Sequence, residues 1–232
     1  DTTTPTVENS FDVVTYTGTG TNQSVDTDFK PDLVWIKGRT QAGSNPVIYD
    51  SIRGAGEYIL PNTTGAEGTI TTGLTSFNST GFTVGSEVGH NNSGSNYVAW
   101  CWKAGDHDDN LPQINTEGSI DSVVSVNDAA GFSIVKYTGN LTASTVGHGF
   151  SSTPELIIVK RTDSTSNWFV YSLPTGNTKY LNLDSTGAAT TFNVWNNTSP
   201  TSNVFSLAAQ GDVNASGGDY IAYCFTSIAG YQ

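Results

Sequence analysis

The sequence has few charged residues, few cysteines and histidines, and no long apolar run. Charged residues make up 13% of its 232 residues, against roughly a quarter in an average soluble domain. The polar surface must therefore be built largely from Thr, Ser, Asn and Gly, which is typical of extracellular and virion β-proteins. No apolar stretch reaches the roughly 18 residues that a transmembrane helix needs, so we predict no membrane insertion.

The charge that is present is mostly negative. The chain has 21 Asp and Glu against nine Lys and Arg, which gives a formal net charge of −12 at pH 7. Such a chain repels a phosphate backbone instead of releasing its counterions. The composition therefore predicts that nucleic acid is not a partner, and it favours solubility.

Cysteine says little about the compartment in which the protein works. The two cysteines, Cys101 and Cys224, each lie in the middle of an aromatic and apolar run. A disulfide between them would require two hydrophobic cores to touch, so we expect two buried free thiols, with the disulfide as the alternative. A chain of this length can bury enough apolar surface to fold without such a link.

An internal repeat is the strongest pattern in the sequence. Five blocks of residues recur in the same order roughly 122 positions later, with only small insertions between them. The clearest block comprises Asn91, Ser93, Gly94, Tyr97, Ala99 and Cys101, which recur as Asn214, Ser216, Gly217, Tyr220, Ala222 and Cys224. Such a repeat indicates one structural unit that is used twice.

Strand patterns dominate both copies. Short runs rich in Val, Ile, Thr, Tyr, Phe and Trp are bounded by Gly, Asn, Asp and Ser, and no window has sustained helical periodicity. We therefore predict an all-β fold of two tandem antiparallel β-sandwich modules, jelly-roll or lectin-like, related by internal duplication. We expect Trp100 and Trp102 to be core residues, and Lys37 and Lys160 to mark where two central strands emerge into solvent.

The two modules are predicted to cover residues 1–110 and 111–232. The segment between the copies opens with polar residues from Gly105 to Pro112, which are typical of a linker. The alternation of residues from Ile120 to Val126 then predicts one more strand, which leads into the second module.

Histidine provides no catalytic motif. The three histidines are His90, His107 and His148, and none lies in a nucleophile elbow or a metalloprotease motif. His107 falls in the polar linker. His90 falls in a turn, and its partner in the second copy is Val213. Because a lone histidine in a turn is usually a surface residue, we expect His90 at the surface.

Carboxylate pairs are candidate catalytic groups, because glycosidases use two carboxylates and some are built on β-sandwiches. Glu57 and Glu67 are the candidates for a polysaccharide hydrolase or lyase. Their partners in the second copy are Lys179 and Ala189, so the pair is not shared by the two modules. We therefore predict that the protein is not an enzyme and keep this activity as an alternative.

An acidic segment partly matches a calcium loop. Asp106, Asp108 and Asn110 stand at positions one, three and five, and Glu117 stands at position twelve. Position six is Leu111 where that loop requires glycine, and neither flank is predicted to be helical. We expect a hydrated linker and no cofactor, with Ca²⁺ bound by these three side chains as the alternative.

Two tryptophans flanked by polar residues are the candidates for ligand contact. Trp168 and Trp195 lie beside Asn167 and Asn196, and sugar rings stack on indoles while amides bond their hydroxyls. The competing interpretation makes both rings edge aromatics that close the sandwich. The sequence leaves both possibilities open.

Several segments of the second copy resemble a repeated domain found in structural and tail-fibre-like proteins of marine bacteriophages. The segments that carry the resemblance are residues 132–140, Gly147-His148-Gly149-Phe150, and residues 154–160, 195–202 and 220–225. In the first copy, residues 31–37, 50–54 and 97–103 carry it, whereas residues 21–29 lack the Gly-His-Gly.

The resemblance implies a virion or extracellular setting and supplies no active site. We expect a non-enzymatic tail fibre, spike or capsid-decoration component that mediates host-surface attachment or virion assembly. Its expected partners are other virion proteins, a host cell-surface glycan and further copies of itself in a homo-oligomer. A lectin-like carbohydrate-binding module is the first alternative.

Overall fold

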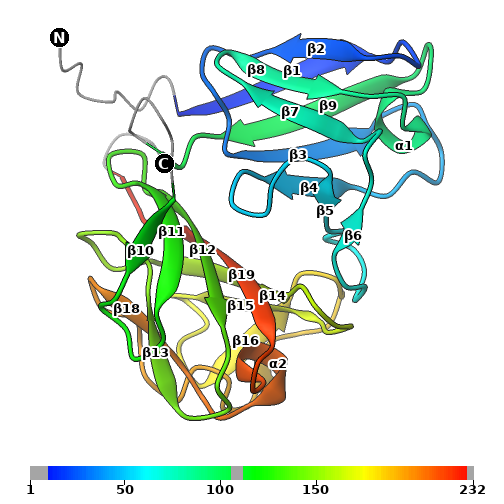
Figure 1. Cartoon of the computed structure of the whole chain (residues 1–232). Coiled ribbons are helices and arrows are strands. Elements are labelled where there is room, and N and C mark those ends of the chain that lie inside the picture. Colours follow the sequence, from blue (N-terminus) through cyan, green and yellow to red (C-terminus); the bar gives the residue numbers. More distant parts are fainter. Residues whose placement is uncertain (1–9, 106–111, 229–232) are drawn as a thin grey trace, which may run out of the picture. The chain divides into compact units, whose positions relative to one another are not determined.

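The structure is a computed structural model that describes residues 10–105 and 112–228 (Figure 1). The described chain is all-β, with several antiparallel sheets of which none is closed, and it contains no helix long and apolar enough to cross a membrane. It divides into two compact units: unit 1 is Asp1–Asn62 with Glu67–Ala104, and unit 2 is Thr63–Ala66 with Gly105–Gln232. The predicted boundary at residue 110 lies outside the described residues.

The described part of unit 1 is built mainly from a four-stranded and a three-stranded sheet (Figure 1). The four-stranded sheet has the order β1 (Phe11–Thr17), β9 (Asn96–Trp102), β3 (Leu33–Gly38) and β4 (Val47–Asp50). The remaining elements are the three-stranded sheet β2 (Gln23–Asp26), β8 (Gly81–Val84) and β7 (Leu74–Asn78), the pair β5 (Glu57–Tyr58) and β6 (Gly68–Thr69), and the short helix α1 (Val88–Asn91).

The core of unit 1 lies between these two sheets, and strand alternation decides which side chains enter it. In β9, Tyr97 and Cys101 are fully buried, whereas Trp100 and Trp102 on the opposite face are partly exposed. Phe82 of β8 packs in the same cluster as Tyr97 and Cys101. The expectation that both tryptophans are core residues is therefore wrong, because the second sheet covers the other face of β9.

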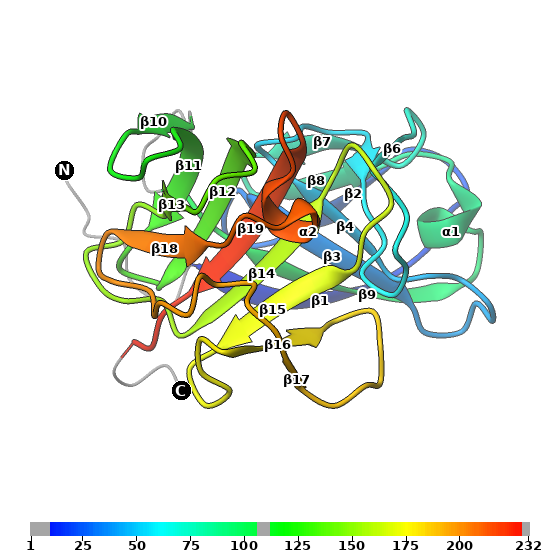
Figure 2. The same cartoon turned by 90° about the horizontal axis from the view of Figure 1, so that it is seen from below.

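The described part of unit 2 contains one large and one small sheet, and Figure 2 shows the large one from below. The large sheet has the order β10 (Gln113–Asn115), β11 (Ser122–Asn127), β12 (Phe132–Thr138), β19 (Asp219–Phe225), β14 (Leu156–Arg161), β15 (Trp168–Ser172), β16 (Lys179–Asn182) and β17 (Thr190–Thr191). The small sheet pairs β13 (Ser144–Gly147) with β18 (Val204–Leu207), and the short helix α2 (Gly211–Asn214) precedes β19. The strand expected around Ile120 to Val126 is present as β11.

The two units share an order of neighbouring strands. The order β1-β9-β3-β4 in unit 1 matches the order β12-β19-β14-β15 in unit 2. The register matches as well, because Tyr16 faces Tyr97 in one unit and Tyr137 faces Tyr220 in the other. The two rings stack in each pair, with centroids 5.2 Å apart in unit 1 and 5.1 Å apart in unit 2.

A buried asparagine ends the short helix in each unit and joins it to the chain that follows β1 in unit 1 and β12 in unit 2. Asn91 accepts a hydrogen bond from the amide of Thr19 at 2.9 Å and donates to the carbonyls of Thr21 and Gly85 at 2.6 Å each. The same three kinds of bond join Asn214 to the amide of Asn140 at 2.8 Å and to the carbonyls of Thr142 at 2.6 Å and Ala208 at 3.3 Å.

Cys101 and Cys224 are free and buried, which confirms the prediction of two unpaired thiols. Burial raises the pKa of both thiols. The raised pKa keeps both thiols protonated at neutral pH, and the thiolate is the reactive form of cysteine. Both side chains therefore serve as small apolar core residues.

Lys160 does not emerge into solvent as expected. Its side chain is fully buried, and its Nζ donates hydrogen bonds to the carbonyls of Ser166 at 2.9 Å and Thr64 at 3.2 Å. The loss of hydration on burial lowers the pKa of Lys160 to about 8. Its place in the sequence, directly after an apolar run, gives no sign of the carbonyl groups that surround the ammonium.

Candidate functional site

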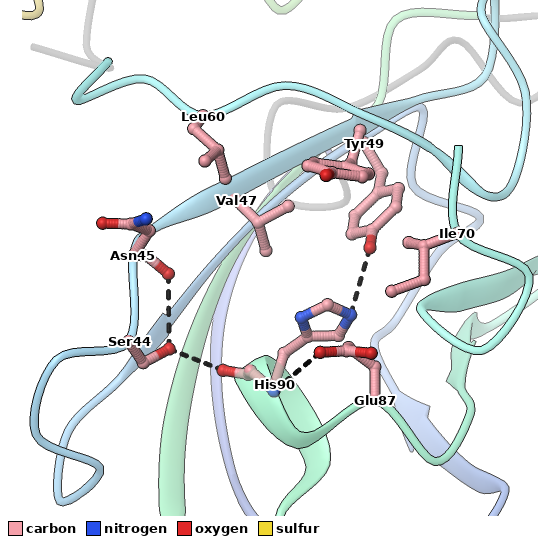
Figure 3. A pocket seen from close by; sticks show the side chains of 10 residues that line it. Ser44, Asn45, Val47, Tyr49, Leu60, Ile70, Glu87 and His90 are labelled. Carbon is pink, nitrogen blue, oxygen red and sulfur yellow. Dashed lines mark hydrogen bonds between the residues drawn. The ribbon is translucent and has the colours of Figure 1, made fainter. Parts of the chain in front are cut away.

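Unit 1 contains a pocket of about 200 Å³ beside α1 and β4 (Figure 3). Apolar and aromatic side chains form much of its wall. They are Val47 and Tyr49 from β4, Tyr58 from β5, and Leu60 and Ile70 from the chain that follows β5 and β6.

The polar groups of the pocket come from two short segments. Glu87, Gly89 and His90 belong to α1 and its N-terminal cap, and Ser44 and Asn45 belong to the loop between β3 and β4. The Glu87 side chain accepts a hydrogen bond from the amide of Gly89 at 3.2 Å, which caps the helix. The cap thereby fixes a carboxylate at the wall of the pocket.

A neutral pair of side chains, Tyr49 and His90, lies at the centre of the site. The Tyr49 hydroxyl and His90 Nε2 are 3.0 Å apart. Burial lowers the pKa of His90 to about 4 and raises the pKa of Tyr49, so that the imidazole is neutral and the phenol protonated at pH 7. The second ring nitrogen, Nδ1, is directed into the pocket (Figure 3) and has no hydrogen-bond partner among the described residues.

The opposite wall of the pocket is held by hydrogen bonds to the backbone. The Ser44 hydroxyl donates to the carbonyl of Gly89 at 2.6 Å, and Lys37 Nζ donates to the carbonyl of Ser44 at 2.5 Å. Asn62 donates to the side-chain oxygen of Asn45 at 2.9 Å. The first bond joins the β3–β4 loop to α1, the second joins it to β3, and the third joins it to the chain after β5, so the pocket is preformed.

The corresponding region of unit 2 has larger or apolar side chains. The bond from the amide of Gly85 to the carbonyl of Gly73 matches the bond from Ala208 to Val194. Unit 2 therefore has Val194 and Trp195 where unit 1 has Gly73 and Leu74. A Cβ at Gly73 would clash with the Tyr49 hydroxyl. Val213 and Gln210 of unit 2 stand in place of His90 and Glu87.

Trp168 and Trp195, the tryptophans predicted to contact a ligand, lie in the interior. Trp168 is 0% exposed and Trp195 is 2% exposed, and their indole nitrogens donate to the carbonyls of Thr63 and Lys179. A ring without a free face cannot stack on a sugar, so the prediction of stacking at these two positions is corrected. Polar neighbours in sequence do not reveal burial, because the groups that enclose a side chain come from other parts of the chain, as Thr63 does for Trp168 and Lys179 for Trp195.

Asn167 and Asn196, predicted beside these rings, are both exposed. Asn196 adopts a positive φ of 52°, and its carbonyl accepts a hydrogen bond from the Thr198 hydroxyl at 2.9 Å. The structure does not bring either side chain to the pocket of unit 1. Their role in binding stays a prediction.

The predicted calcium ligands Asp106, Asp108 and Asn110 lie outside the described residues, as does His107. Glu117, the fourth position of that pattern, is exposed and accepts a hydrogen bond from the side chain of Asn203 at 3.0 Å. Within residues 10–105 and 112–228, no group of three or more His, Cys, Asp or Glu side chains is placed to hold a metal ion.

The two carboxylates considered for hydrolysis are both engaged by protein groups. Glu57 accepts hydrogen bonds from the Thr69 hydroxyl at 2.9 and 3.2 Å. Glu67 forms an ion pair with Arg53 at 2.9 Å, and Arg53 is itself buried against Asp50. These contacts give both carboxylates a structural role.

His90 was expected at the surface and is instead 6% exposed. The prediction is wrong because it relied on the turn in which the residue lies. A better signal was present in the sequence, since its partner in the second copy is the apolar Val213, which is fully buried. The buried valine at the corresponding position of the second copy indicates that the fold buries this position in both units.

The strand order and the pocket together define an all-β protein with two units, one of which carries a small site of mixed polarity. A family model described as a domain of unknown function, DUF7483, matches residues 7–232. The chain belongs to this family. No curated protein and no solved structure matches the chain.

Proposed function

We propose that this protein is a non-enzymatic surface component of a virus particle, of the tail-fibre, spike or capsid-decoration kind. It mediates attachment to a host surface or assembly of the particle, together with other virion proteins and further copies of itself. Its two units are tandem jelly-roll-like sandwich modules that arose by duplication. The resemblance of residues 132–140 and 154–160 to structural proteins of marine bacteriophages supports the setting.

The observation that carries this proposal is a pocket in unit 1, on a framework that unit 2 repeats with different side chains around the corresponding positions. Asn91 and Asn214 make corresponding hydrogen bonds in the two units, which supports a common origin. The residues around the pocket differ, with His90 in unit 1 and Val213 in unit 2. A retained framework with altered loops is the usual way in which duplicated β-modules acquire a recognition site.

The chemistry of the pocket favours binding over catalysis. A general acid or base works best when its pKa lies near the working pH, whereas burial lowers the pKa of His90 to about 4. At neutral pH the imidazole is therefore uncharged and offers a fixed hydrogen-bonding group. Its contact with Tyr49 fixes the orientation of the ring.

The location of the chain in a purified particle tests the proposal. Mass spectrometry of density-purified particles, with immunogold labelling by an antibody to this chain, should find it at the particle surface in many copies. Sedimentation of the recombinant chain should show a homo-oligomer. If the chain is found only in the soluble fraction of infected cells and is absent from intact particles, the proposal is wrong.

Carbohydrate binding is the second candidate function, and the pocket of unit 1 favours it. The partly exposed ring of Tyr58 lies beside Glu87, Asn45 and His90, which combines an aromatic surface with groups that bond hydroxyls. A glycan array probed with the full chain tests it directly, since a lectin role requires binding that is lost when the pocket is altered.

A further inference from the structure

We infer that the pocket of unit 1 binds one uncharged pyranose ring, such as the terminal hexose of a neutral glycan. The inference rests on the second candidate function and adds the ligand class and the site. It concerns residues that lie within unit 1 alone.

The size of the pocket limits the ligand to one ring. Its volume is about 200 Å³, which is below the roughly 300–1,000 Å³ of pockets that enclose drug-sized ligands. A longer glycan can enter with its terminal ring, and the rest of the chain then extends beyond the pocket.

The walls of the pocket suit the two kinds of surface that a pyranose presents. Tyr58 provides a partly exposed aromatic ring, and Leu60 and Ile70 provide partly exposed aliphatic surface for the C–H faces of the sugar. Tyr49 is 0% exposed and forms the floor against which His90 is held. Figure 3 shows Val47, Leu60 and Ile70 arranged around the space in front of the Tyr49–His90 pair.

The polar group at the centre of the pocket suits a hydroxyl. His90 is 94% buried, since its exposed fraction is 6%, and its Nδ1 faces the pocket without a partner among the described residues. Because Nδ1 opens onto the pocket, a ligand hydroxyl can reach it. A sugar hydroxyl can both donate and accept, so it satisfies Nδ1 in either neutral tautomer of the imidazole.

The charge of the site excludes acidic sugars. Glu87 supplies a carboxylate at the wall of the pocket, and His90 is neutral at pH 7 because burial lowers its pKa to about 4. The whole chain adds a net charge of −12. Glu87 is the charged side chain among the residues that line the pocket, and Lys37 is engaged by the carbonyl of Ser44. A uronic or sialic acid would therefore meet repulsion from Glu87, whereas the hydroxyls of a neutral sugar donate to it.

A titration of the full chain with simple sugars tests the inference. The probes are the methyl glycosides of glucose, galactose and mannose, free N-acetylglucosamine, and glucuronic acid as the acidic comparison. Binding followed by two-dimensional NMR should saturate with one site per chain for at least one neutral sugar, with a Kd on the order of 1 mM. Signals of Tyr49, Tyr58 and His90 should shift, and glucuronic acid should bind at least about tenfold more weakly.

Three variants localise the binding. His90→Val installs the residue that unit 2 carries at Val213 and should weaken sugar binding at least about tenfold, because Nδ1 is lost. Glu87→Gln keeps an oxygen that accepts from the amide of Gly89. It should weaken binding of neutral sugars about threefold and reduce the difference in affinity between neutral sugars and glucuronic acid. Glu117→Gln, which removes an exposed carboxylate of unit 2, is the matched control and should bind as the parent does.

The outcomes separate this inference from the proposed function. Failure of every neutral sugar to bind the folded chain refutes the inference, and so does binding that Glu87→Gln and a folded His90→Val leave unchanged. If amides of N-acetylated amino acids shift the pocket signals while sugars do not, the site takes a protein side chain and the inference is wrong. Detection of the chain on particles leaves the proposed function in place in each of these cases.

Discussion

At the scale of single residues, both described histidines are buried and bonded as neutral rings. His148 donates from Nε2 to the carbonyl of Thr201 at 3.1 Å and accepts at Nδ1 from the amide of Phe150 at 3.2 Å. Burial lowers the pKa of His148, as it does for His90. Protonation of His148 at Nδ1 would break the hydrogen bond from the amide of Phe150. Low pH should therefore destabilise the folded state at His148.

Stability should therefore fall as the pH drops below neutral. The pKa of His90 is about 4 in the folded chain against 6.5 as its ordinary value, so between these values the unfolded chain binds the proton more readily. The contribution of His90 is fully present above pH 6.5 and decreases by up to about 3 kcal/mol as the pH falls to 4. Urea unfolding at a series of pH values from 7.5 to 4 measures this loss.

The variant His90→Val isolates this contribution from other titrating groups. Its free energy of unfolding should depend less steeply on pH than that of the parent between pH 6.5 and 4, since valine binds no proton. Equal slopes for the two proteins would show that His90 titrates normally and is not held neutral by burial.

The burial of Trp195 predicts a large cost on truncation. Trp195 packs edge-on against Tyr171, with ring centroids 6.0 Å apart, and it belongs to the core cluster of unit 2. Trp195→Ala should lower the free energy of unfolding by about 3–5 kcal/mol, measured by urea denaturation. Phe192→Ala, at a side chain that is 46% exposed, is the control and should change it much less. A cost for Trp195→Ala as small as that of the control would indicate a surface ring.

At the scale of elements, each four-residue helix is held by its terminal asparagine more than by its own hydrogen bonds. Isolated helices of this length are unstable in water. Asn91 and Asn214 are fully buried, and they connect their helices to the chain that follows β1 and β12, respectively. In unit 1 this connection also holds Glu87 and His90 at the pocket.

Removal of either asparagine side chain should destabilise the protein. Asn91→Ala and Asn214→Ala each leave one amide and two carbonyls without their partner, and each should lower the free energy of unfolding by about 2–4 kcal/mol. Asn92→Ala is the matched control, because unit 2 has Ala215 at that position, and its effect should stay within about 0.5 kcal/mol. Equal effects at Asn91 and Asn92 would contradict the role of the buried amide. Chemical denaturation measures all three.

At the scale of the whole molecule, net charge is the property that acts over the longest range. The excess carboxylates that give a formal charge of −12 repel one another in the folded state. The buried ion pair of Arg53 and Asp50 is screened less than exposed charges are, so added salt should act mainly on the repulsion.

Salt should therefore stabilise the protein. Between 0.01 and 0.1 M NaCl the screening length falls from about 30 to about 10 Å, and we expect Tm to rise by a few degrees as repulsion among the 21 carboxylates weakens. Differential scanning calorimetry at pH 7 measures the change. A falling Tm would show that favourable ion pairs outweigh the repulsion.

Local patterns in the sequence were sufficient to predict the all-β class, the strand at β11 and the burial of both cysteines. These properties follow from side-chain alternation and apolar runs, which act over a few residues. The repeat pairs Asn91 with Asn214 and Tyr97 with Tyr220, and these pairs prove to make corresponding contacts in the two units.

The positions of Trp100, Trp168, Lys160 and His90 depended on tertiary packing. Trp168, Lys160 and His90 are covered by residues far away in sequence, whereas Trp100 lies on the face of β9 that the second sheet leaves partly exposed. Thr63 and Thr64 enclose Trp168 and Lys160. The pocket likewise requires β4, α1 and the chain after β5 to meet. A linear pattern records which side chains share a face, and the packing of one sheet on another decides which face is covered.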